Sequence, residues 1–102
     1  MKIIELLSEH IEYELEDACT YANLALEYKE SDPEVAALFY KLSGEEMTHM
    51  DALHKRVVSS IEKYKQKNGE APDGMKALYD FMHKRQIAQA EKFTNLQNLF
   101  RK

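Results

Sequence analysis

Apolar residues recur every three or four positions along most of the chain, which is the period of an α-helix with one buried face. The first break in this pattern contains Ser31, Asp32 and Pro33. Either of the first two can cap a helix, and proline suits the first helical position. The second break covers residues 68–74, where Asp73 can cap the helix that follows. The sequence therefore predicts three helices, near residues 3–30, 33–67 and 74–100.

Each of the first two helices carries one stripe of apolar positions, obtained by advancing about 100° per residue. The stripe of the first helix is Leu7, Ile11, Glu14, Ala18, Tyr21, Ala25 and Tyr28. That of the second is Val35, Phe39, Leu42, Glu46, His49, Leu53, Val57 and Tyr64. Because the break between the helices is short, we expect them to pack as an antiparallel hairpin. Glu14 then faces Glu46 and His49, which lie at a similar distance from the break.

Carboxylates and an imidazole on a core-facing stripe are costly to bury unless something compensates them, and a metal ion does so. Residues three apart on a helix project to the same side, so Glu46 and His49 can ligate one ion. Oxygen and nitrogen donors suit iron, manganese or zinc. Tyr21 lies two turns beyond Glu14 on the same face, where its hydroxyl could hydrogen-bond a ligating carboxylate. We expect a metal site formed by Glu14, Glu46 and His49.

An acidic residue three positions before a histidine is, by itself, weak evidence for a metal site. The same spacing occurs at Asp51–His54 and Asp80–His83, and most such pairs are solvated pairs on a helix face. Asp51 projects to the opposite side of its helix from Glu46, so we interpret Asp51–His54 as solvent-facing. Asp80 points away from the apolar stripe of the third helix. That stripe is Leu78, Met82, Ala90, Phe93 and Phe100.

Two further polar residues and the cysteine lie near the first stripe. His10 is one turn before Glu14, where it is either an outer ligand or proton shuttle, or an exposed surface histidine. Glu16 is off the stripe and has the same ambiguity between a role near the metal and a solvated charge. Cys19 points away from the stripe, and we interpret it as inert.

The composition, with 44% hydrophobic and 31% charged residues among 102, is that of one globular domain. The formal net charge of −4 and the lack of a basic patch argue against a nucleic-acid partner. One cysteine fits a reducing compartment and excludes an intrachain disulfide. No apolar run approaches the ~20 residues of a membrane span, and no signal peptide is visible. The expectation is a soluble, cytoplasmic protein without membrane contact.

At these residues the chain resembles the ferritin-like di-iron carboxylate superfamily. In that site two helices each give a Glu and two others each give a Glu-x-x-His. Glu14-x6-Tyr21 and Glu46-x-x-His49 look like one half of it. The strings around residues 14–17, 32–34 and 45–49 look most like the encapsulated ferritins, short half-ferritins that complete the site by dimerising. The resemblance covers roughly residues 8–60.

The resemblance implies that Glu14, Glu46 and His49 are iron ligands and that Tyr21 supplies a phenol beside them. Glu16 would match an acid at the family's metal entrance. Many members also dock into an encapsulin shell through a C-terminal peptide, which the ending of this chain, residues 98–102, does not obviously resemble.

One chain offers three ligands, too few for two metals, whereas two chains offer six. We therefore expect an all-α fold in which a hairpin and a third helix dimerise into a ferritin-like four-helix bundle. The expected function is a ferroxidase that binds two iron ions per dimer, with manganese or zinc as other possible metals. The expected assembly is a homodimer or a higher homo-oligomer built from such dimers. Storage would then be external or inside a shell such as an encapsulin. One alternative is a rubrerythrin-like oxidoreductase acting on peroxide. The other is a non-enzymatic helical interaction module with a buried polar network.

Overall fold

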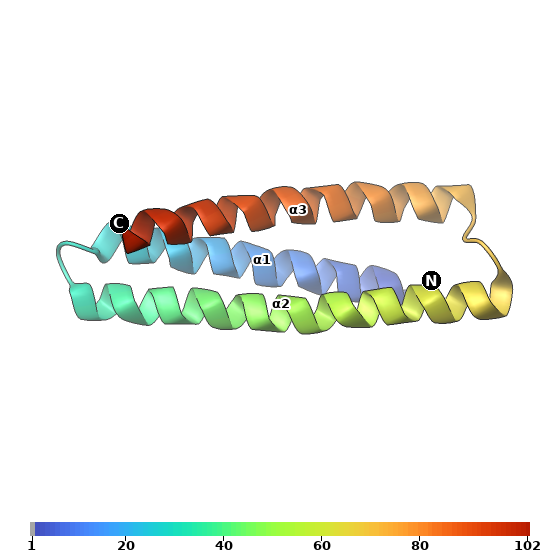
Figure 1. Ribbon diagram of the computed structural model, residues 1–102, viewed down its shortest axis with the longest axis horizontal. Coiled ribbons are helices and arrows are strands. Elements are labelled where there is room, and N and C mark those ends of the chain that lie inside the picture. Colours follow the sequence, from blue (N-terminus) through green and yellow to red (C-terminus); the bar gives the residue numbers. More distant parts are fainter. Residues whose placement is uncertain (1) are drawn as a thin grey trace.

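The computed structural model describes residues 2–102, which form three α-helices and no strand. They are α1 (Lys2–Tyr28), α2 (Pro33–Asn68) and α3 (Asp73–Arg101), shown in Figure 1. The predicted all-helical fold and its three helices are thus confirmed, with ends within two residues of those expected.

The breaks between the helices are built largely as the sequence indicates. The Asp32 carboxylate accepts a hydrogen bond of 3.2 Å from the backbone N–H of Val35, and Pro33 opens α2. Gly69 ends α2 with a φ of 79°, a left-handed conformation that favours glycine. The prediction that Asp73 caps α3 is wrong. Pro72 holds the cap position without a side-chain hydrogen bond, and Asp73 lies in the first turn, where its charge complements the helix dipole.

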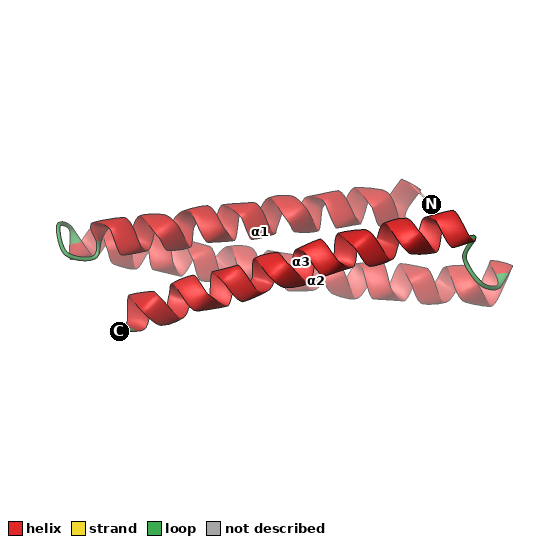
Figure 2. Ribbon diagram, turned by 90° about the horizontal axis from the view of Figure 1, so that it is seen from above, coloured by secondary structure: helices red, strands yellow, loops and turns green. Residues whose placement is uncertain are grey.

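The helices form an elongated bundle measuring 55 × 18 × 18 Å. α1 and α3 run in the same direction and α2 runs opposite to both (Figure 1). Seen from above, α3 crosses the hairpin of α1 and α2 at an angle (Figure 2). The α1 backbone approaches those of both other helices, whereas α2 and α3 approach each other less closely. α1 is therefore the element that joins the bundle together.

Small residues on α1 let α3 pack closely against it. One buried cluster consists of Ala18, Cys19 and Ala22 of α1 with Phe93 of α3, and Met47 of α2 packs against it. Because alanine and cysteine side chains are short, the aromatic ring of Phe93 can fill the space between the three helices. A second cluster, formed by Ile11, Leu15 and Val57, continues the core toward the other end of the bundle.

The buried face of α1 is rotated from the predicted stripe. Ile11, Ala18 and Ala25 are buried as expected, but Tyr28 is 37% exposed. Positions outside the stripe are buried as well, namely Ser8, Leu15, Cys19 and Ala22. The cause is α3, because a helix with two neighbours must bury a wider face than a helix in a hairpin. Cys19 does point away from the predicted stripe, but it points toward α3.

Within the part of the chain that the structure describes, no helix is long and apolar enough to cross a membrane.

Candidate metal centre

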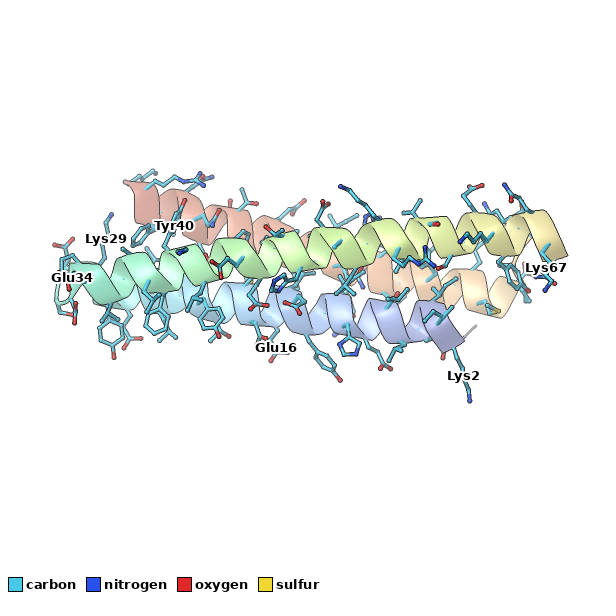
Figure 3. The ribbon with its side chains drawn as sticks, turned by 90° about the horizontal axis from the view of Figure 1, so that it is seen from below. Lys2, Glu16, Lys29, Glu34, Tyr40 and Lys67 are labelled. Carbon is cyan, nitrogen blue, oxygen red and sulfur yellow. The ribbon has the colours of Figure 1, made fainter. Side chains whose placement is uncertain are left out.

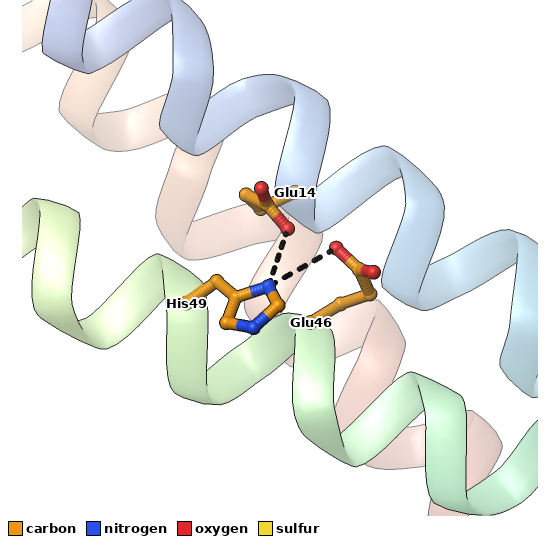
Figure 4. Close-up of side chains that lie close together, drawn as sticks. All are labelled: Glu14, Glu46 and His49. Carbon is orange, nitrogen blue, oxygen red and sulfur yellow. Dashed lines mark ion pairs between the residues drawn. The ribbon is translucent and has the colours of Figure 1, made fainter.

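Glu14 of α1 and the pair Glu46 and His49 of α2 converge in the structure (Figure 4). The Nδ1 atom of His49 lies 3.4 Å from Oε2 of Glu14 and 3.9 Å from Oε2 of Glu46. One ligand atom from each residue can be chosen so that all three lie within 4.8 Å of one another. The structure thus brings together the three residues predicted as metal ligands.

The core of the bundle fixes the position of Glu14. Ile11 and Leu15, one turn before it and one residue after it, are each 1% exposed, so α1 cannot turn about its axis without disrupting the core. In Figure 4 the ribbon of α3 runs behind the hairpin, beyond the three side chains. The Glu14 and Glu46 side chains are 25% and 19% exposed, whereas that of His49 is 60% exposed. The site therefore opens to the surface on the side of His49.

The proximity of Glu14 makes the Glu46 carboxyl harder to ionise. The hydrogen bond with Glu14, partial burial and the negative charge of Glu14 together raise the pKa of Glu46 to about 7, and His49 opposes this effect. Two close carboxylates resist ionising together, because each disfavours the charged form of the other. In addition, Oε2 of Glu14 is buried and, when both carboxylates are ionised, accepts no hydrogen bond within residues 2–102. A cation bound here would offset the repulsion between the two carboxylates and would give Oε2 of Glu14 a partner.

The spacing of the ligand atoms fits a metal ion. Ligand bonds of about 2.0–2.2 Å to one ion place two ligand atoms roughly 3–4.3 Å apart. The two distances from His49 Nδ1 fall in this range. Two carboxylate oxygens and an imidazole nitrogen are a donor set for iron, manganese or zinc, and three ligands leave positions open for water or a reactant. The residues present thus fit the predicted metal.

The structure places the predicted supporting residues at varying distances from this cluster. The Tyr21 ring is half-buried and stacks on Phe39 with centroids 6.0 Å apart, and within residues 2–102 its hydroxyl makes no hydrogen bond to Glu14 or Glu46. His10 is exposed and meets Tyr13 edge-on at 5.7 Å. Glu16 is exposed (Figure 3). None of the three residues joins the ligand cluster.

The interpretation of His54 as solvent-facing is wrong, although Asp51 is indeed exposed. The His54 ring is half-buried between α2 and α3, with its centroid 5.8 Å from that of His83. A signal for the inward position of His54 exists in the sequence, because Met47, His54 and Ile61 recur every seven residues and define a second inward face of α2. The prediction used only the face that packs on the first helix.

The raised pKa of Glu46 predicts that stability falls as the pH rises. The pKa is about 7 in the fold against 4.5 ordinarily, so the folded chain holds the proton more tightly. The resulting stabilisation is complete below the ordinary pKa and is lost as the pH rises through about 7. Thermal unfolding of metal-free protein between about pH 5 and 8 should therefore show the wild type losing stability relative to Glu46→Gln, which cannot ionise.

The matched control for this measurement is Glu45→Gln, because Glu45 is the exposed neighbour of Glu46. We expect its pH profile to run parallel to that of the wild type. If the wild type and Glu46→Gln instead show parallel profiles, the pKa of Glu46 is not raised by folding.

Searches against protein-family models, curated proteins and solved structures found no match. The relationship to the ferritin-like superfamily accordingly remains the resemblance described above.

Proposed function

We propose that this chain is an iron-binding ferroxidase, which oxidises Fe(II) to Fe(III) at a two-iron site shared between two copies, for iron storage or detoxification. The observation that carries the proposal is the convergence of Glu14, Glu46 and His49, with ligand atoms within 4.8 Å of one another. The raised pKa of Glu46 supports it, since a site that resists holding a second negative charge is suited to receive a cation.

The incompleteness of the ligand set supports a homodimer. Three ligands from one chain suffice for one partly coordinated ion, and a second copy across a two-fold axis doubles the set. Apolar side chains flank the ligands on the same helix faces. Ile3 and Tyr28 stand about three turns before and four turns after Glu14, and they are 52% and 37% exposed. Leu38, which is 53% exposed, stands about three turns before His49. A second copy would cover these residues together with the site.

The reaction treats Fe(II) as the substrate. Each of two Fe(II) ions loses one electron, and dioxygen takes up two electrons and two protons to give hydrogen peroxide. With hydrogen peroxide as the oxidant, the same electrons and protons give two waters. The dimer would hold both ions at one place, so that two electrons are delivered together. Because metal binding requires ionised carboxylates, it releases the proton held by Glu46.

The fate of Fe(III) follows from size. A chain of 102 residues that forms a rod 18 Å wide encloses no mineral cavity. Fe(III) would be released or passed to a store outside the dimer. A surrounding protein shell such as an encapsulin could enclose that store.

Two observations weigh against the alternative functions. A rubrerythrin-like oxidoreductase needs cysteine pairs for its electron-transfer iron, whereas Cys19 is the single cysteine of this sequence. A non-enzymatic module with a buried polar network needs buried members, whereas the side chain of His49 is 60% exposed.

The test is an anaerobic titration of the metal-free chain with Fe(II), followed by admission of air. We expect about one iron oxidised rapidly per chain, which is two per dimer, and a dimer mass in solution when the metal is bound. A strictly monomeric chain at working concentration, with and without metal, would exclude the shared site. Mass can be followed by light scattering or sedimentation in the same samples.

A further inference from the structure

Two histidines from different helices lie side by side on another part of the bundle. His54 of α2 and His83 of α3 have ring centroids 5.8 Å apart and planes inclined by 18°. Tyr79 stacks on His83 as well, with centroids 5.7 Å apart. Both histidines are half-buried. Each is preceded three residues earlier by an aspartate, so two Asp-x-x-His segments meet where α2 and α3 run antiparallel (Figure 1).

One imidazole nitrogen at this contact has no hydrogen-bond partner within residues 2–102. Nδ1 of His83 is buried and makes no hydrogen bond within residues 2–102. An imidazole nitrogen buried in this way costs free energy that a hydrogen bond or a metal bond would recover. The neighbouring aspartates do not supply the partner. Asp51 pairs with Lys55 at 3.2 Å, and Asp80 is exposed and forms no ion pair with either ring within the described chain.

We propose that His54 and His83 form a second metal site, a bis-imidazole clamp for a borderline divalent ion of the Zn²⁺ or Cu²⁺ class. With metal–nitrogen bonds of about 2.0–2.1 Å, two imidazoles on one ion have ring centres roughly 5–6 Å apart. The observed separation of 5.8 Å falls in that range. Because the terminal torsion of a histidine side chain is soft, both rings can turn their nitrogens toward one ion while the helices stay in place.

The chemistry of this pair differs from that of the first site. Two nitrogen donors without a carboxylate favour Cu²⁺, Ni²⁺ or Zn²⁺ over iron or manganese. Waters would complete the coordination, so the ion exchanges more readily than one held by four protein ligands. The ion would also connect α2 to α3, whose backbones approach each other less closely than either approaches α1. The clamp does not depend on the ferroxidase proposal, because it uses none of the three ligands of that site.

The test uses Cu²⁺ as the probe, because electron paramagnetic resonance reveals the nitrogen atoms bound to this ion. The host is the full chain with Glu46→Gln, which weakens the first site. One equivalent of Cu²⁺ should give a spectrum with two imidazole nitrogens. His54→Gln and His83→Gln, each introduced into this host, should lose that spectrum while keeping their helical circular dichroism. His10→Gln is the matched control, because His10 is an exposed histidine on α1, and it should keep the spectrum.

Zn²⁺ provides a second measurement. An ion that binds only the folded chain raises the midpoint of thermal unfolding as its concentration increases. We expect this rise in the Glu46→Gln host, and its loss when His54→Gln or His83→Gln is added. The clamp is overturned if the host shows a single bound nitrogen. It is equally overturned if the two-nitrogen spectrum or the Zn²⁺-dependent rise survives in both histidine variants.

Discussion

Replacing Glu46 by glutamine is expected to reduce aerobic Fe(II) oxidation to the rate of protein-free solution. Glutamine keeps the size of the side chain but cannot supply an anionic oxygen, and Glu46 is one of the three groups within residues 2–102 that converge at the site. Removing a residue that only hydrogen-bonds to a metal ligand already costs about 10–100-fold in metal affinity or activity. We therefore expect the loss of a ligand to exceed about a hundredfold. The measurement is the initial rate of Fe(III) absorbance after air is admitted.

The control is Glu45→Gln, the same chemical change on the neighbouring exposed residue. It should oxidise iron at the wild-type rate, because the side chain of Glu45 points away from the cluster. Equal rates in the wild type and Glu46→Gln would exclude this site as the place of oxidation. Circular dichroism of the three proteins separates loss of the ligand from loss of the fold, since both substitutions leave the buried core untouched.

Truncating Phe93 to alanine is expected to destabilise the chain by about 3–5 kcal/mol, the usual cost of removing a buried phenylalanine. Phe93 is 5% exposed and contacts Ala18, Cys19 and Ala22 across the interface between α1 and α3. The alanines opposite it are too small to fill the space left behind. Since small domains have only about 5–15 kcal/mol of stability in total, the loss should shift the urea unfolding midpoint strongly.

Phe81→Ala is the matched control on the same helix. Phe81 is 58% exposed, and it contacts Arg85 through a cation–π interaction with the guanidinium 5.7 Å from the ring centroid. An exposed contact of this type contributes about 0.5–1 kcal/mol, so this variant should stay close to the wild type. Comparable losses in the two variants would show that Phe93 is not buried between the helices and that α3 is docked differently.

The sequence predicted the helices and the convergence of Glu14, Glu46 and His49 for the same physical reason. A long helix repeats its buried face every 3.6 residues, so a polar residue on that face stands out. Glu14 interrupts one apolar stripe, and Glu46 and His49 interrupt the other. The short break at Asp32 and Pro33 then brings these residues to the same level of the hairpin, as the structure shows.

The docking of α3 could not be predicted in the same way. Its partners on α1 are small residues such as Cys19 and Ala22, whose weak hydrophobicity hardly changes the periodic pattern. The contact between His54 and His83 was missed for a related reason, because a histidine at the inner face of one helix gives no indication of the residue that faces it. The electrostatics of Glu46 also required coordinates, since its pKa depends on the distance to Glu14.

The unequal anchoring of the ligands has a consequence for how a metal would pass through the site. Glu14 is preorganised, because Ile11 and Leu15 lock its helix into the core at 1% exposure each, and a preorganised ligand loses little freedom on binding. The imidazole of His49, with its side chain 60% exposed, is the adjustable member of the set. An exposed ring of this kind would not require the core to open if it rotated outward. Rotation of the His49 side chain toward the two glutamates would then be the last step of ion binding. Rotation away from them would be the first step of ion release.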